Sequence, residues 1–322
     1  MTAPKKFASQ ADLEDKQVSF TRLSANAYAY TAEGDPNTGI IIGDDAVMVI
    51  DTQATPAMAQ DVIRRIREVT PLPIKYVVLS HYHAVRVLGA SAYFKEGAEQ
   101  IIASRDTYDL IVERGEQDKA SEIGRFPRLF RNVESVPPGL TWPTMTFEGE
   151  MSVWLGKLEV KLKQIGRGHT KGDTIAYLED QKICFAGDLV EYQSTAYAGD
   201  CYFRDWPATL DRLDAFKFDK LVPGRGAALE TAATTGKAIA STRAFISDVY
   251  TLVHSGVADG KNLNTIYKEA IAALRPKYGH WVIFDHCMPF DVTRAYDEAT
   301  GHVHPRIWTA ERDIEMWQTL EG

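Results

Sequence analysis

The sequence has few cysteines, no long apolar run and no excess of basic residues. Its three cysteines are an odd number without Cys-x-x-Cys spacing, which favours free thiols in a reducing compartment over a disulfide framework. No apolar run approaches the roughly 18 residues of a membrane-spanning helix. Residues 1–17 contain no apolar stretch and predict no secretory signal. We therefore expect a cytoplasmic protein that does not enter the membrane.

The balance of charge argues against nucleic-acid binding. Acidic residues number 44 and basic residues 36, giving a net charge of −8. A polyanion-binding surface needs clustered lysines and arginines that neutralise phosphates, and the sequence has no such stripe. Hydrophobic residues make up 45% and charged residues 25%, which is ordinary for a globular protein. We expect a small-molecule substrate rather than a nucleic acid.

The first part of the chain has the pattern of a sheet covered by helices. Residues 39–50 predict two short buried strands around a Gly-Asp-Asp turn. A helix is expected to follow, with Thr55 as its N-cap and Pro56 at its first position. Residues 74–79 then predict a strand that ends at Ser80 and His81. Strand, helix and strand in succession are typical of a layered α/β arrangement.

The pattern changes twice further along. Apolar and charged residues alternate over 158–163, which predicts a half-buried strand. More strands are expected at 174–179, 183–187 and 220–222, with a helix at 207–217 and a polar helix near 106–122. From 231 the sequence is rich in alanine and predicts helices at 231–254 and 262–275, then a proline- and histidine-containing segment, and a last helix near 310–320. We place a domain boundary near residue 230, with a core at 1–230 and a helical extension at 231–322.

Four short polar segments each follow a predicted strand. They are Ser80-His81-Tyr82-His83, Gly168-His169-Thr170, Gly187-Asp188-Leu189 and Pro223-Gly224-Arg225-Gly226. Loops at strand ends are where rigid scaffolds place functional groups, and two histidines separated by one residue can point the same way. Imidazole and carboxylate together are usual ligands of catalytic zinc. Each segment alone has an ordinary structural explanation, but their joint order favours a metal site.

In this order the segments resemble the metallo-β-lactamase superfamily, and within it the glyoxalase II-like hydrolases. The matching stretches are SHYHAVR at 80–86, GHTKGDT at 168–174, FAGD at 185–188 and LVPGRG at 221–226. The resemblance implies an α/β or α+β fold, namely a four-layer αββα sandwich with a metal site at one edge between its two sheets. It also implies that one metal ion is bound by His81, His83 and His169, with Asp188 as a bridging carboxylate.

The sequence departs from the superfamily pattern where a second metal ion is usually bound. The usual His-x-His-x-Asp-His has Val85 in place of the aspartate and Arg86 in place of the last histidine, and the usual Pro-Gly-His ends in Arg225. Valine has no donor atom, and arginine stays protonated. We therefore expect a single divalent ion, zinc before iron. The two guanidinium groups are expected to hold Asp188, and either to bind an anionic substrate group or merely to fill the vacated space.

The resemblance leads to an expected mechanism. A zinc ion with three neutral imidazoles lowers the pKa of its water to about 7, which suits hydrolysis of a small anionic ester, thioester, lactone or amide. Asp188 is expected to act as ligand or general base, while Arg86, Arg225 or Tyr82 stabilises the oxyanion. Supporting roles are expected for Asp173, which would orient His169, and for Asp51.

Two other functions stay open, as do the roles of the remaining candidates. Histidines and a carboxylate also suit a mononuclear non-haem iron oxidoreductase or dioxygenase, and the loss of second-site ligands suits a non-catalytic binding protein with a vestigial metal site. Tyr197 and Tyr202 are expected either to line the substrate pocket, as Tyr82 does, or to pack in the core. The histidines of residues 231–322 have no strong zinc spacing, which argues against a role as metal ligands. The aromatic residues of this part are expected to pack it on the core, where it can serve as a lid or a homodimer interface.

Overall fold

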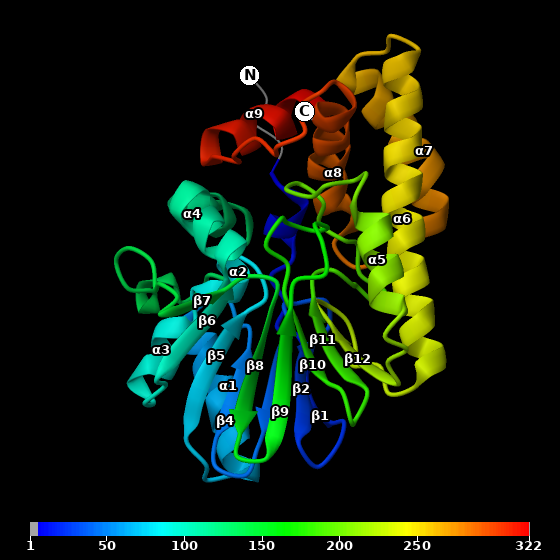
Figure 1. The fold of residues 1–322 in the computed structure, drawn as a ribbon. Coiled ribbons are helices and arrows are strands. Elements are labelled where there is room, and N and C mark those ends of the chain that lie inside the picture. Colours follow the sequence, from blue (N-terminus) through cyan, green and yellow to red (C-terminus); the bar gives the residue numbers. More distant parts are fainter. Residues whose placement is uncertain (1–5, 322) are drawn as a thin grey trace.

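The computed structural model describes residues 6–321, which form two mixed β-sheets flanked by helices (Figure 1). The first sheet contains, in spatial order, β1 (Val18–Arg22), β2 (Ala27–Ala32), β3 (Thr38–Ile42), β4 (Val47–Ile50), β5 (Ile74–Leu79), β6 (Gln100–Ser104) and β7 (Met145–Phe147). The second contains, in spatial order, β12 (Lys220–Pro223), β11 (Ile183–Gly187), β10 (Ile175–Leu178), β9 (Leu158–Lys163) and β8 (Glu150–Leu155). The pairs β4–β5, β5–β6, β6–β7 and β11–β12 are parallel. The other pairs are antiparallel.

The helices cover the outer faces of both sheets and continue beyond them. The helices between the strands are α1 (Pro56–Val69), α2 (Ala84–Val87), α3 (Ala90–Lys95), α4 (Arg105–Arg125) and α5 (Trp206–Asp214). The C-terminal part adds α6 (Ala232–Ala258), α7 (Leu263–Tyr278), α8 (Phe284–Ala299) and α9 (Ala310–Glu321). Short 3₁₀ turns occur at Ala8–Ala11 and Val133–Ser135.

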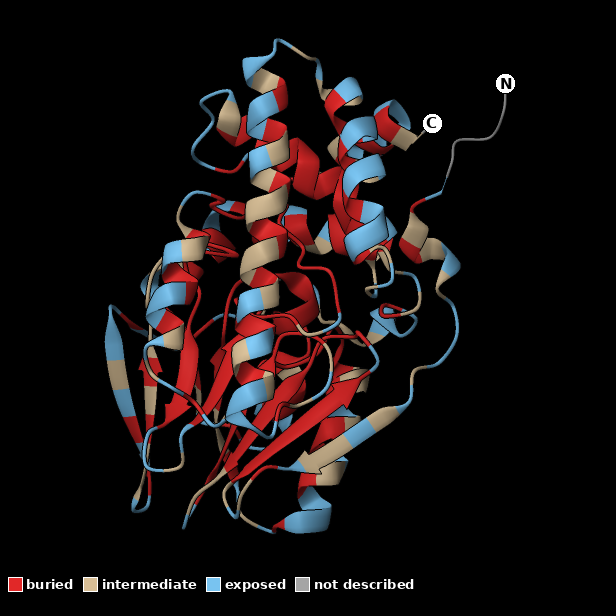
Figure 2. Cartoon of the chain, turned by 90° about the vertical axis from the view of Figure 1, so that its right-hand side faces the viewer, coloured by how far each residue is buried: buried red, intermediate tan, exposed pale blue. Residues whose placement is uncertain are grey.

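Three buried apolar clusters define the layers. One fills the space between the two sheets and includes Met48 and Phe185. A second lies between the first sheet and the helices α1, α3 and α4. The third packs α5 to α9 against the second sheet and includes Trp206. Most strands are accordingly buried, whereas the edge strands β1 and β8 are partly exposed and α6 exposes one face (Figure 2). The expected αββα sandwich with C-terminal helices is confirmed.

Local sequence signals account for the elements that deliver the chain to the strand ends. The Thr55 side chain accepts a hydrogen bond from the Met58 N–H, and Pro56 opens α1, as the sequence predicts. Helix α1 then serves as the crossover that parallel pairing of β4 with β5 requires. Strand β5 matches the predicted bounds and releases the chain at Ser80.

Helix α8 was not predicted as a helix, because its interior contains Pro289, and an interior proline normally ends or kinks a helix. The carbonyl that loses its partner belongs to Asp285, an exposed residue where water can replace the missing hydrogen bond. The loop between β12 and α6 contains residue 230, and the division of the chain there stays a prediction. Among the described helices, none has the length and apolar character needed to cross a bilayer.

Candidate metal centre

Three histidines from separate segments meet at one edge of the sandwich. His81 and His83 follow β5, and His169 lies in the loop between β9 and β10. Their candidate ligand atoms all lie within 4.8 Å of one another. The three side chains are buried, and the Thr174 N–H donates to the Ser80 carbonyl at 2.8 Å, which fixes the two histidine-bearing segments beside each other.

Hydrogen bonds fix the protonated nitrogen of each ring. Nδ1 of His169 lies 2.8 Å from the Tyr197 carbonyl, which can only accept. Nε2 of His83 lies 3.2 Å from Oδ2 of Asp200. Nδ1 of His81 lies 2.9 Å from the Ser80 hydroxyl, whose own proton goes to Asp51 at 2.7 Å. In each ring the hydrogen-bonded nitrogen is therefore the donor, and the other nitrogen presents its lone pair to the common point.

These lone pairs fit a cation. Nδ1 of His83 and Nε2 of His169 lie 3.0 Å apart, and Nε2 of His81 is buried without a hydrogen-bond partner among the described residues. Two nitrogens bound tetrahedrally to zinc at about 2.05 Å would lie roughly 3.4 Å apart. Burial lowers the pKa of His169 to about 3 and that of His81 well below its usual value. Burial acts in the same direction on His83, but the charges of Asp118 and Asp200 and the hydrogen bond to Asp200 outweigh it and raise the pKa of His83. Two nitrogen lone pairs that face each other at this distance repel unless a proton or a metal ion lies between them. Neutral imidazole is the form that binds a metal ion.

Asp188 lies beside the three rings directly after β11. Its Oδ2 is 3.7 Å from Nε2 of His81 and 3.6 Å from Nε2 of His169. Arg86 donates from Nη2 to Oδ1, and Nη1 of Arg225 lies 3.0 Å from Oδ2. Burial opposes ionisation, but the charges of Arg86 and Arg225 outweigh it and hold the pKa of Asp188 well below its usual value. The carboxylate is therefore ionised and held in place next to the histidines.

The two arginines differ in their surroundings. Arg86 is enclosed, and it also donates to the carbonyls of Asn37 at 2.9 Å and Gly224 at 2.7 Å. Arg225 also contacts Glu191 at 3.2 Å and lines a cavity. Val85, next to Arg86 on α2, is buried and offers no donor atom. Val85 is thus apolar, Arg86 and Arg225 are cationic, and both cations contact Asp188.

Several residues that support the site have no signal in the sequence. Asp200 lies in the segment between β11 and α5, where it contacts His83 and accepts from Nη1 of Arg114 at 3.1 Å. Arg114 in turn donates to the Pro305 carbonyl at 3.1 Å and lies 3.2 Å from Nε2 of His304. The C-terminal part thereby reaches the metal centre, and no spacing pattern marks these long-range contacts in advance.

Of the two aspartates expected to support the histidines, only Asp51 does so in the structure. Asp51 supports His81 through Ser80, as described above. The expectation that Asp173 orients His169 is wrong, because Asp173 accepts hydrogen bonds from the backbone and hydroxyl of Thr170 instead, and the Tyr197 carbonyl takes the contact with His169. Burial raises the pKa of Asp173 to about 7, with the Thr170 hydrogen bonds opposing it.

The three tyrosines expected at the substrate are all buried. The Tyr197 hydroxyl lies 3.5 Å from Nη1 of Arg125, and the Tyr202 hydroxyl lies 3.2 Å from Nδ1 of His304. The Tyr82 ring lies beside His83, with ring centroids 4.4 Å apart. None of the three belongs to the lining of the cavity that reaches Arg225, and their assignment to substrate binding stays a prediction.

The chain is similar in sequence to known proteins over part of its length. The linear primary-alkylsulfatase of Pseudomonas sp. (strain ATCC 19151) is 22% identical over 218 residues, covering 58% of this chain and 40% of that protein. The 2,4-dinitroanisole O-demethylase subunit alpha of Nocardioides sp. (strain JS1661) is 26% identical over 196 residues, covering 60% of this chain and 53% of that protein. The chain thus spans about half or less of the length of these curated relatives.

A solved structure shares the fold. The metallo-beta-lactamase from Pontibacter korlensis superposes with a TM-score of 0.58 at 20% sequence identity, covering 72% of this chain and 99% of its own. Residues 31–225 match the family described as the metallo-beta-lactamase superfamily. This stretch contains the three histidines, Asp188 and both arginines, and it makes up more than half of the chain. The chain therefore belongs to the metallo-beta-lactamase superfamily.

Proposed function

We propose that the protein is a metal-dependent hydrolase that uses one divalent metal ion, zinc before iron, to cleave a small anionic ester, thioester, lactone or amide. The observation that carries this proposal is the convergence of three imidazole lone pairs on one buried point beside Asp188. Bound there, the ion would supply a Lewis acid and an activated water.

The chain's own residues have separable roles in this proposal. Asp200, Ser80 and the Tyr197 carbonyl orient the three rings, so little reorganisation is needed when the metal binds. Asp188 is the fourth ligand or the proton acceptor, and Arg86 and Arg225 keep it ionised and aimed at the rings. Arg225, which lines the cavity, is placed to bind an anionic group or a developing oxyanion.

The single-ion proposal follows from the side chains around Asp188. A second ion would lie against two guanidinium groups, which cannot be deprotonated to become ligands. The arginines supply positive charge there without a metal. They also pair with the carboxylate that would otherwise bridge two ions.

An anionic substrate is favoured by the balance of charge. Of the two carboxylates that are hydrogen-bonded to Arg86 and Arg225, only Asp188 is held ionised, because burial and the charge of Asp188 raise the pKa of Glu191 to about 8. An excess of positive charge in a low-dielectric site attracts an anionic ligand. The alkylsulfatase relative acts, by its name, on an anionic ester, which is in keeping with this class.

The test combines elemental analysis with turnover. Protein isolated without added metal is assayed for metal content and for hydrolysis of 4-nitrophenyl acetate and 4-nitrophenyl sulfate, beside His169→Ala and the control His254→Ala, which changes an exposed histidine on α6. We expect about one ion per chain, retained in the control and lost with turnover in His169→Ala. Two ions per chain would overturn the single-ion proposal. Iron with oxygen consumption would support an oxidoreductase, and bound metal without turnover a binding protein.

A further inference from the structure

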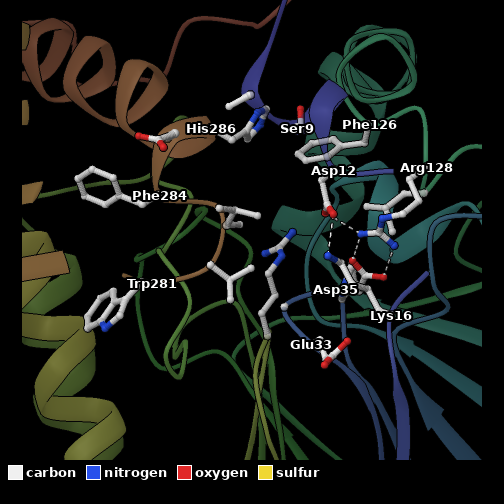
Figure 3. Close-up of a pocket in the computed structure, with 18 of the residues that line it drawn as sticks. Ser9, Asp12, Lys16, Glu33, Asp35, Phe126, Arg128, Trp281, Phe284 and His286 are labelled. Carbon is white, nitrogen blue, oxygen red and sulfur yellow. Dashed lines mark hydrogen bonds and ion pairs between the residues drawn. The ribbon is translucent and has the colours of Figure 1, made fainter. Parts of the chain in front are cut away.

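A cavity of about 270 Å³ lies between the start of α8, the segment that follows α4 and the loop between β2 and β3 (Figure 3). Its lining therefore combines the αββα core with the C-terminal helices. The volume is near the lower end of the ~300–1,000 Å³ typical of small-molecule sites. It is large enough for a compact ligand with one ring.

His286 is an unpartnered polar side chain in this lining. It is 2% exposed, and neither ring nitrogen has a hydrogen-bond partner among the described residues. The ring lies against Phe126 and Phe290, with centroid distances of 4.4 Å and 5.3 Å. Burial lowers the pKa of His286 well below its usual value, and Arg125 and Arg225 act in the same direction. A neutral imidazole offers one donor and one acceptor, and buried polar groups are almost always paired.

Arg225 joins the cavity to the metal centre. It lines the cavity, while its Nη1 contacts Asp188 at 3.0 Å and Glu191 at 3.2 Å. The loop between β2 and β3 makes a second connection, because Asp35 and Pro36 line the cavity. The next residue, Asn37, accepts from Arg86 and donates to the Pro223 carbonyl at 2.9 Å. A molecule in the cavity would therefore reach the residues that hold Asp188.

The rest of the cavity lining is polar on one side and aromatic on the other. Lys16 pairs with Asp12 at 2.6 Å, and Arg128 pairs with Asp12 at 3.1 Å and Asp35 at 2.5 Å, so this side satisfies its own charges. Phe284 and Trp281 lie on the side opposite that ion-pair cluster (Figure 3). The other two carboxylates of the lining also have partners, because Glu33 accepts from the Gln17 N–H at 2.8 Å and Asp285 pairs with Arg275 at 2.5 Å. Among the buried side chains of the lining, the His286 ring has no hydrogen-bond partner and Arg225 uses Nη1 for its contacts with Asp188 and Glu191.

The backbone at the aromatic wall is strained. Ile283 lines the cavity and precedes α8 with a φ of 58°, a left-handed conformation that is rare for a β-branched residue. Such strain is found where surrounding contacts hold a segment for a ligand. Here Val282 is fixed to the core, because its carbonyl accepts from the Thr195 N–H at 3.0 Å and its own N–H donates to Gln193 at 3.2 Å.

We propose that this cavity is a substrate-recognition site for a small aromatic anion, with the ring against the aromatic wall. A hydroxyl or amide of the ligand pairs with one nitrogen of the His286 imidazole, and its anionic group contacts Arg225. The statement that the bound ligand is the substrate rests on the proposed function. The recognition itself rests on the lining of the cavity.

The test uses 4-hydroxyphenylacetate and phenylacetate as probes, titrated calorimetrically into the full metal-loaded protein. We expect 4-hydroxyphenylacetate to bind about tenfold more tightly, because its hydroxyl pairs with His286. His286→Phe should remove this preference by weakening 4-hydroxyphenylacetate about tenfold while leaving phenylacetate unchanged. The control His280→Phe changes an exposed histidine outside the lining and should bind both probes as the unmodified protein does.

A second variant keeps the inference testable if His286→Phe does not fold. Ala8→Leu enlarges a residue of the lining and should weaken both probes. Equal binding of the two probes to the unmodified protein, or an undiminished preference in His286→Phe, would overturn the inference. Because these readouts are binding constants, the site can be confirmed in a protein without hydrolytic activity, and hydrolysis can be confirmed without this site.

Discussion

Nε2 of His83 lies 3.2 Å from the Asp200 carboxylate, while Nδ1 of the same ring lies 3.0 Å from His169. One imidazole thus connects the metal centre to a buried ion pair, because Asp200 also accepts from Arg114. Burial opposes ionisation of Asp200, but the hydrogen bond and charge of His83, with the charge of Arg114, lower its pKa to about 2. The carboxylate stays ionised and keeps the proton of His83 on Nε2.

Asp200→Asn should weaken metal binding about 10- to 100-fold, as loss of a carboxylate behind a metal-bound histidine commonly does. The amide no longer fixes the tautomer of His83, so its Nδ1 lone pair is not held toward the metal. Competition with a chromophoric chelator measures the affinity. Asp205→Asn, which loses a partly exposed ion pair with Arg167, is the control. Unchanged affinity in Asp200→Asn would remove Asp200 from the site.

Gly224→Ala should also weaken metal binding, by displacing Asp188. A Cβ at residue 224 would lie 2.2 Å from Oδ1 of Asp188 and 2.9 Å from its Cα, so the carboxylate and its backbone have to move. Chelator competition again measures the effect. The control is Gly236→Ala on α6, where a Cβ meets nothing within 4 Å and where alanine stabilises a helix by about 0.5–1 kcal/mol. Wild-type affinity in Gly224→Ala would show that Asp188 is not needed for metal binding.

Arg86→Met should lower the free energy of unfolding by about 3–5 kcal/mol, as loss of one member of a buried ion pair does. The substitution leaves Asp188 with one arginine and the Asn37 carbonyl without its donor, while the Gly224 carbonyl keeps only the Asn37 N–H. Urea denaturation measures the loss. Arg64→Met on α1, whose ion-paired side chain is 60% exposed, should change stability far less. Equal stability of the two variants would contradict the structural role of Arg86.

Glu191→Gln should change how stability depends on pH. Burial, together with the charge of Asp188, raises the pKa of Glu191 to about 8 against the opposing charge of Arg225. The folded state therefore holds this proton more tightly than the unfolded chain. The protonated Glu191 adds to the free energy of unfolding, and this contribution is fully present below the usual pKa of 4.5. As pH rises from there towards 8, the free energy of unfolding falls by up to about 1.4 kcal/mol per pH unit.

The measurement is urea unfolding of metal-free protein at intervals between pH 5 and 8. The unmodified protein should lose stability across this window relative to Glu191→Gln, since the glutamine carries no titrating proton. Parallel profiles for the two proteins would show that Glu191 titrates at its ordinary pKa.

The fold and the core of the site could be predicted because their signals are local. Thr55 and Pro56 mark the start of α1, and the alternation over 158–163 marks β9. The order of His81, His83, His169 and Asp188 sufficed to predict a metal site before any contact was known. Helix α8 escaped prediction because Pro289 is a local signal against the helix that tertiary packing overrides.

The chain's own pattern established that imidazole and carboxylate groups stand at strand ends, with Arg86 and Arg225 in short segments that also follow predicted strands. Folding decided which groups support them, because Asp200, Asn37 and Ser80 act through contacts between segments distant in sequence. The same holds for His286, which meets the site across a cavity that forms when the C-terminal helices pack on the core. Hydrogen bonds and burial depend on which surfaces are brought together, and no spacing along the chain encodes that.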